Sequence, residues 1–262
     1  LDTGAENVAV GYLSLTTEDG NGKNVAVGYA TLQNQNAGAD AYNVAVGHNA
    51  GNDITTGVRN TFIGGATGGS TTTGQRNIAV GYQALTTNVL GSRSVAVGYN
   101  ALSIQNYATA TDGFNTAVGH EAGAAVTTGI ENTLVGGLAG DALTDADYNT
   151  AIGYLALSGD TLGSRSVAIG RSALQVQNFT TATNAYNVGI GFQTGDSITT
   201  GVENVLVGGL AGDALTDADY NVAIGTAALS ADTLGSRSVA IGQGTLGAQN
   251  FTTATNTYNT AV

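Results

Sequence analysis

Asn43-Val44-Ala45-Val46-Gly47 is the stretch that decides the fold, because the same pattern recurs along the whole chain. Each copy has Asn or Ser first, then Val, Thr or Ile, a mostly small residue, Val or Ile, and, in every complete copy, Gly. We call the first position the anchor. The fifteen anchors are Asn7, Asn24, Asn43, Asn60, Asn77, Ser94, Asn115, Asn132, Asn149, Ser166, Asn187, Asn204, Asn221, Ser238 and Asn259. Such a recurrence is typical of stacked repeat proteins, in which each unit contacts only its neighbours.

The spacing of the anchors defines a larger repeat. From Asn43 onward, three spacings of 17 residues are followed by one of 21, and this set of four occurs three times. The resulting superrepeats of 72 residues are 43–114, 115–186 and 187–258. We therefore interpret residues 1–262 as a single solenoid region. Because the chain starts and stops within repeats, we expect it to be a fragment of a longer fibre protein.

The residues within one repeat predict short strands. Val44 and Val46 alternate with Ala45, and a period of two residues is typical of a β-strand. A second short strand is expected after the glycine, as in 82–85, followed by a turn rich in Thr, Gly, Asp and Asn. We predict an all-β fold, a parallel β-solenoid or β-roll of about 15 coils of 17–21 residues.

The anchors and the glycines four residues later are expected to be structural. Every coil needs the same corner, so a glycine required by a tight turn is required each time. The anchor amide can bond to backbone groups and stack on the next anchor. The representative positions are Asn43, Gly47, Asn115, Gly119, Asn187, Gly191, Ser166 and Gly170.

The core of a single flat roll is small, which favours assembly with other chains. We expect the β-branched pair of each strand to point into the coil and the small middle residue to point outward. The outward row would then let other chains approach closely, most simply in a homotrimer with three-fold symmetry. The residues predicted to face the trimer are Ala45, Ala117, Ala168 and Ala240.

Composition excludes several classes of partner. The formal net charge is −12, with only 7 Lys and Arg, so neither nucleic acid nor an anionic membrane surface is expected to bind. No apolar run approaches the roughly 18 residues that span a bilayer, so we expect no direct membrane insertion in this segment. Cysteine is absent, which excludes disulfides and thiolate metal sites.

The motif Ser166-Val167-Ala168-Ile169-Gly170 resembles the head repeat of trimeric autotransporter adhesins. The stretches 77–82 and 115–120 equally resemble the shaft repeats of phage tail fibres. The resemblance covers essentially the whole chain, although these coils are longer than the usual adhesin head coil. It implies a left-handed β-roll, a homotrimeric fibre and an extracellular location on a bacterial cell surface or a virion. The implied role is cell adhesion as a structural shaft or head segment, with a host glycan or protein as a possible receptor.

The enlarged fourth coil of each superrepeat is the candidate receptor contact. Its extra residues read alike in the three superrepeats. They are Gln105, Asn106, Tyr107, Gln177, Asn178, Phe179, Gln249, Asn250 and Phe251. An aromatic ring flanked by amides suits a sugar, and repeated weak sites gain by multivalency. The alternative is that each ring covers the edge of the roll or packs against a neighbouring chain.

No constellation of catalytic groups can be assembled, so we predict that the chain is not an enzyme and has no cofactor or metal. His48 and His120 share a variable surface position, and the acid pairs 145/147 and 217/219 are interpreted as solvated turns. Lys23, Arg93, Arg165 and Arg237 each precede the anchor of a fourth coil, with Asp160 and Asp232 a few residues before the last two. We expect these cations to form a ladder of weak surface ion pairs. A less favoured alternative is an ice-binding solenoid, because Thr-Thr-Gly precedes four anchors without forming an unbroken ladder.

Overall fold

The computed structural model describes residues 6–18 and 22–262, and within these ranges it contains strands and turns but no helix. The chain is a parallel β-solenoid of about fifteen coils, which confirms the predicted all-β architecture. It divides into two compact units, Leu1–Glu131 and Asn132–Val262. Both units are built from the same coil, so each is described by itself.

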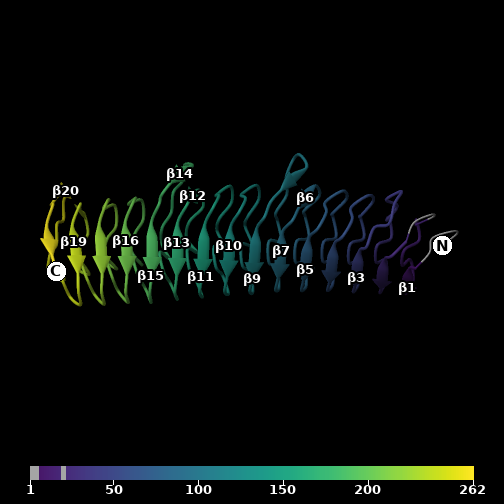
Figure 1. Ribbon diagram of the computed structural model, residues 1–262, viewed down its shortest axis with the longest axis horizontal. Coiled ribbons are helices and arrows are strands. Elements are labelled where there is room, and N and C mark those ends of the chain that lie inside the picture. Colours follow the sequence, from purple (N-terminus) through teal and green to yellow (C-terminus); the bar gives the residue numbers. More distant parts are fainter. Residues whose placement is uncertain (1–5, 19–21) are drawn as a thin grey trace. The chain divides into compact units, whose positions relative to one another are not determined.

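In the first unit, the main sheet takes one short strand from each coil. Its strands lie in chain order in Figure 1, and each strand pairs in parallel with the next. The strands are β1 (Val8–Val10), β2 (Val25–Val27), β3 (Val44–Val46), β4 (Thr61–Ile63), β5 (Ile78–Val80), β7 (Val95–Val97) and β9 (Thr116–Val118). The short strand β6 (Gly91–Ser92) at the end of the third coil pairs separately with β8 (Thr111–Asp112) in the enlarged fourth coil.

The second unit repeats this arrangement. Its main sheet contains β10 (Thr133–Val135), β11 (Thr150–Ile152), β13 (Val167–Ile169), β15 (Val188–Ile190), β16 (Val205–Val207), β17 (Val222–Ile224), β19 (Val239–Ile241) and β21 (Thr260–Ala261). Two small pairs are added, β12 (Gly163–Ser164) with β14 (Thr183–Asn184) and β18 (Gly235–Ser236) with β20 (Thr255–Asn256). Each strand residue pairs with its equivalent in the next coil, as Ala151 does with Ala168.

The second strand expected in each coil is not formed. Residues 82–85 are a turn, because Gln83 and Leu85 both have left-handed backbone angles, with φ of 55° and 54°. Extended backbone requires negative φ, so two left-handed residues separated by one residue prevent a strand. The equivalent positions of the other coils have the same conformation, as at Ser172 and Leu174.

The strand side chains point in the direction opposite to the one expected from the sequence. Ala45, Ala117, Ala168 and Ala240 are completely buried inside their own coils, so the prediction that they face a trimer partner is wrong. The β-branched residues on either side of them point outward and are partly exposed. The physical reason is the thickness of the coil, which has no room for two rows of β-branched side chains.

Interior volume is balanced between two positions. Where the eighth residue after the anchor is Leu, the middle residue of a neighbouring strand is Ala or Gly, and a Cβ added at Gly189 would lie 2.8 Å from Leu174 Cγ. Where the eighth residue is Gly, the middle residue can be large, and the ring of buried Phe62 fills the space beside Gly68. Close packing of this kind tolerates little change in volume on either side.

The anchors form a buried ladder along each unit. Asn43 Nδ2 donates to the carbonyl of Gly57 at 2.8 Å, and its Oδ1 accepts from the backbone N–H of Asn60 at 2.8 Å. Four residues on, Gly47 has φ of 140°, and a Cβ there would lie 2.3 Å from the carbonyl oxygen of Gly64. Only glycine allows adjacent coils to approach this closely at the corner. Gly119, Gly170 and Gly191 have the same left-handed conformation.

Candidate functional site

The enlarged fourth coil encloses a buried polar cluster. In the second unit, Gln177 lies at its centre and is fully buried. Its Nε2 donates to Asp160 Oδ2 at 2.5 Å and to Ser166 Oγ at 3.0 Å, and its Oε1 accepts from Asn187 Nδ2 at 2.8 Å. The side chain therefore joins three consecutive coils. In the other copies, Gln105 contacts Ser94 and Asn115, and Gln249 contacts Ser238 and Asn259.

Asp160 is a buried carboxylate with several donors. Its Oδ1 accepts from the backbone N–H groups of Gly163 and Phe179, at 3.0 and 3.1 Å, in addition to the bond from Gln177 to Oδ2. Burial raises the pKa of Asp160, while these hydrogen bonds act in the opposite direction. Asn88 occupies the equivalent position in the first unit. These contacts are structural and leave no room for the ion pair that we expected between Asp160 and Arg165.

The aromatic rings of these coils are also inside. Tyr107 is 5% exposed and Phe179 is 6% exposed. Tyr107 Oη donates to the carbonyl of Gly129 at 2.9 Å and accepts from Asn115 Nδ2 at 3.1 Å. A sugar cannot stack on a covered ring, so the hypothesis of receptor contact through these two rings is wrong. Phe251, in the last complete coil, is partly exposed.

The amides of the proposed receptor contact separate into two groups. Gln105 and Gln177 are buried and Gln249 is half-buried, so these side chains serve the interior. The side chains that reach the surface are Asn106, Asn178 and Asn250. Asn178 Oδ1 accepts a hydrogen bond from Thr161 at 3.0 Å, and Asn250 has the equivalent bond from Thr233 at 3.2 Å.

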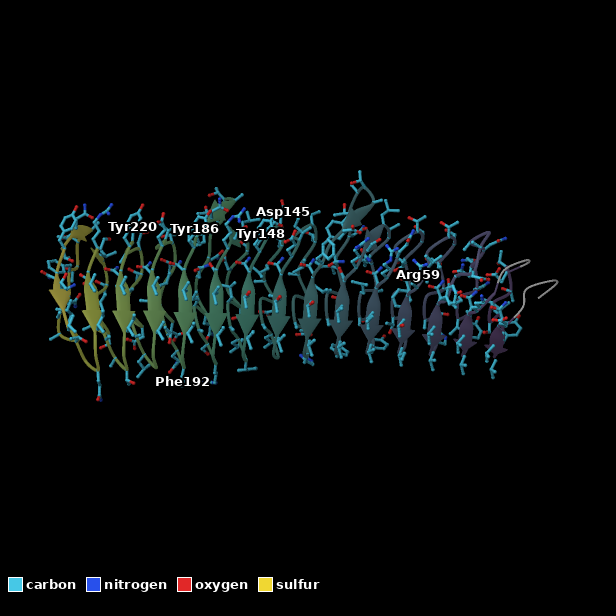
Figure 2. The ribbon with its side chains drawn as sticks, viewed as in Figure 1. Arg59, Asp145, Tyr148, Tyr186, Phe192 and Tyr220 are labelled. Carbon is cyan, nitrogen blue, oxygen red and sulfur yellow. The ribbon has the colours of Figure 1, made fainter. Side chains whose placement is uncertain are left out.

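At the edge where the strands begin, charged and aromatic side chains alternate in the second unit at the position just before the anchor. The guanidinium carbon of Arg165 lies 4.4 Å from the Tyr148 ring centre and 6.0 Å from that of Tyr186. In Figure 2, Tyr148, Tyr186 and Tyr220 lie along this edge, and Phe192 lies at the opposite edge. Arg237 likewise lies over Tyr220 at 4.3 Å. Arg165 and Arg237 therefore contact aromatic rings in place of Asp160 and Asp232. The predicted ion pairs are confirmed at the other two cations, where Lys23 pairs with Asp40 at 2.7 Å and Arg93 with Asp112 at 3.0 Å.

A second row of rings lies at the edge where the strands end. Its members occupy the position five residues after the anchor, which is aromatic in some coils and not in others. In the first unit, Tyr12, Tyr29 and His48 stack with centroid distances of 5.8 and 5.0 Å. Tyr82, Tyr99 and His120 form a second stack at 5.9 and 5.2 Å. These rings are exposed. Sequence reasoning treated this position as a variable surface site, although in the first unit its aromatic residues recur in three of every four coils.

The same row in the second unit has a cation in the middle. The guanidinium carbon of Arg171 lies 6.0 Å from the centre of the Tyr154 ring and 5.6 Å from that of Phe192. Between one group of stacked side chains and the next, the residue at this position is glycine. In the first unit this is Gly65, which lies between His48 and Tyr82 in the order of coils.

The outer face of the main sheet is apolar in both units. The positions one and three residues after the anchor point outward and are Val, Ile or Thr throughout. Ile152, Ile190 and Ile224 are between 37% and 39% exposed. Two parallel rows of β-branched side chains therefore run along each sheet.

The acidic and threonine-rich turns hold partly buried carboxylates and hydroxyls that bond adjacent coils. Burial raises the pKa of Asp196 and Asp213 on adjacent coils, and their repulsion adds to the effect at Asp213. Among the described residues, no three His, Cys, Asp or Glu side chains gather as a metal-binding group, and no pocket is found. The Thr144 and Thr216 hydroxyls donate to carbonyls of the next coil, both at 3.0 Å. No helix in the described ranges has the length and hydropathy needed to cross a membrane.

Comparison with known proteins adds no relative to this description. The sequence matches no protein-family model, and searches of curated proteins and of solved structures gave no match.

Proposed function

We propose that this chain is a rigid spacer segment, a shaft or head, of an extracellular attachment fibre. The fibre would belong to a bacterial cell surface or to the tail of a virion, and the solenoid would be left-handed, as the sequence resemblance implies. The repeated coil supports this proposal, because backbone pairing and the anchor ladder continue from coil to coil within each unit. Such a stack sets a fixed distance per coil without requiring a binding site in every coil.

The apolar outer face of the main sheet is the observation that supports assembly into a homotrimer. Two rows of Val, Ile and Thr lie on a regular surface, and covering them would contribute up to about 1.5–3 kcal/mol for each side chain fully buried. A homotrimer in which the three sheets face a common axis would cover all of these rows at once. The surface that meets the partner chains is therefore the Val and Ile face, in place of the Ala row predicted from the sequence.

A charge on this face tests the assembly. Ile224→Lys would put an ammonium in the centre of the interface, where an unpaired charge is strongly unfavourable. Val176→Lys is the matched control, because Val176 is 43% exposed, similar to Ile224 at 39%, but lies outside the main sheet. Light scattering should give about three times the 26.0 kDa mass of one chain for the native protein and the control. Ile224→Lys should give a folded monomer.

Two results would contradict this proposal. A native protein that is monomeric at micromolar concentration would refute the trimer, and a dimer would refute the three-fold arrangement. Circular dichroism must show that Ile224→Lys retains the native β spectrum, since otherwise the loss of mass would reflect unfolding. An intact trimer in folded Ile224→Lys would place the interface on another surface.

A glycan-binding receptor module is the second candidate function, and the exposed aromatic row favours it. Ice binding remains the less favoured alternative, because the threonine hydroxyls described above are used between coils. Thermal hysteresis measured against bovine serum albumin at equal mass tests ice binding directly.

A further inference from the structure

We infer that Gly65 marks a binding position for a neutral pyranose ring, which inserts between the rings of His48 and Tyr82. The inference concerns the edge where the strands end, and it does not require that the chain be a spacer or a trimer. The three residues occupy the same position in three consecutive coils of the first unit, and only the middle coil has no side chain there. The two rings are the ends of two separate stacks.

Glycine at position 65 is not required by the backbone. Its neighbour Gly64 has φ of 138°, and a Cβ there would lie 2.4 Å from the carbonyl oxygen of Gly81. At Gly65 the backbone angle is ordinary for any residue, and a Cβ would meet only the Tyr82 ring, at 3.3 and 3.6 Å. A side chain at this position requires the exposed Tyr82 ring to move by a few tenths of an ångström, because a Cβ at 3.3 Å is closer than an ordinary contact. The effect of its absence is to leave the near face of the Tyr82 ring uncovered.

The spacing of the coils matches the thickness of one ring. Adjacent strands lie about 4.8 Å apart, so two coils separate His48 from Tyr82 by roughly 9.6 Å. The rings already stacked in this row have centroid distances of 5.0 to 5.9 Å. A six-membered ring placed midway at Gly65 would lie about 4.8 Å from each neighbour, slightly closer than the stacked rings of this row and within the range for stacked rings.

The open rim identifies the ring as a sugar. The row is exposed, with Tyr82 at 53%, so the periphery of a bound ring stays in water. A pyranose whose substituents are all equatorial has C–H groups on both faces and hydroxyls around its rim, which fits two aromatic faces and a hydrated edge. A purely aromatic ligand would expose an apolar rim. The net charge of −12 favours neutral sugars over uronic or sialic acids.

The test uses the whole chain and a defined probe. A soluble β-1,4-linked N-acetylglucosamine trimer should shift the NMR signals of the His48 and Tyr82 rings. A galactose oligomer of the same length should shift them much less, because its axial hydroxyl makes one face polar. Gly65→Tyr fills the position with a ring in the existing stack, so it should abolish binding of the probe without lowering the melting temperature.

Two further variants define the contribution of one ring. Tyr82→Ala should weaken binding about three- to tenfold, the size of one aromatic contact. Tyr42→Ala is the matched control, since Tyr42 is similarly exposed but lies in the row at the other edge, and it should bind like the native protein. The inference is overturned if Gly65→Tyr binds the probe as the native protein does, or if indole binds at His48 and Tyr82 while the sugar does not. It is also overturned if these ring signals are protected from solvent by a second copy of the chain.

Discussion

The buried carboxylate of Asp160 gives the sharpest test of how the coil interior is stabilised. Three donors converge on this fully buried group: the amides of Gly163 and Phe179 and the Nε2 of Gln177. Asp160→Ala removes the acceptor for all three. An orphaned buried donor costs about 1–3 kcal/mol, so we expect the free energy of unfolding to fall by on the order of 4 kcal/mol. Asp160→Asn keeps an acceptor for the two amides and reproduces Asn88 of the first unit, so its cost should be about 1 kcal/mol or less.

The pH dependence of the same pair of proteins separates burial from hydrogen bonding. Because burial raises the pKa of Asp160 in the folded state above 3.8, the folded chain holds the proton more tightly than the unfolded chain. The contribution of this group to stability is therefore complete below pH 3.8 and decreases as the pH rises through the folded pKa. The native protein should lose stability relative to Asp160→Asn over that range, by at most about 1.4 kcal/mol per pH unit.

Urea denaturation of both proteins at a series of pH values from about 3 to 7 measures this difference. Asp53→Asn is the control for a general change in charge, because it removes an exposed carboxylate from the first coil of a superrepeat. A difference between native protein and Asp160→Asn that stays constant, or that increases with pH, would refute the reasoning. In that case the hydrogen bonds from Gly163, Phe179 and Gln177 would outweigh the cost of burial.

Two other substitutions test the packing directly. Ala168→Leu should lower the free energy of unfolding of the single chain by about 1–3 kcal/mol through overpacking. Val167→Leu, on the outer face, should change it by less than about 0.5 kcal/mol. Equal effects of the two substitutions in urea denaturation would contradict the observed side-chain directions. Phe179→Ala should lower the free energy of unfolding by about 3–5 kcal/mol and lower the melting temperature. Phe192→Ala, which removes an exposed ring, should have a small effect. Equal melting temperatures for the two variants would show that the buried ring is dispensable.

The number of coils and the placement of the main strands could be read from the sequence, because the anchor repeats and the alternation around Ala45 have definite periods. The direction of the side chains could not be derived from that alternation, since a period of two residues identifies two faces without saying which is buried. The signal that decides which face is buried is the complementary size of two side chains, those at the middle of the strand and at the eighth position after the anchor. Phe62 occurs in a coil with Gly68, and Gly189 packs on Leu174, which shows that the middle position faces the interior.

The buried polar cluster was missed for a related reason. The position of Gln177 and Asp160 is occupied by Ile198 and Leu143 in other coils, and these are buried. This position is apolar in five of the fourteen complete coils and is therefore an interior position, so its polar members must be bonded to one another. The stacked rings were not predicted, because the changing residue type five residues after the anchor was interpreted as a variable surface position. The spacing of Tyr82, Tyr99 and His120 by one coil each already places them side by side.

The direction of the hydrogen bonds between coils has a mechanical consequence. In each unit these bonds, including those that Asn43 Oδ1 and its equivalents accept from the next anchor, run along the stacking direction. Tension applied along that direction would load one coil at a time and peel it from its neighbour, while tension along the strands would load many bonds in shear. Each 17-residue coil that peels away releases about 56–61 Å of extended chain. A single stretched molecule would therefore lengthen in equal steps, interrupted in every superrepeat by the longer step of the 21-residue coil.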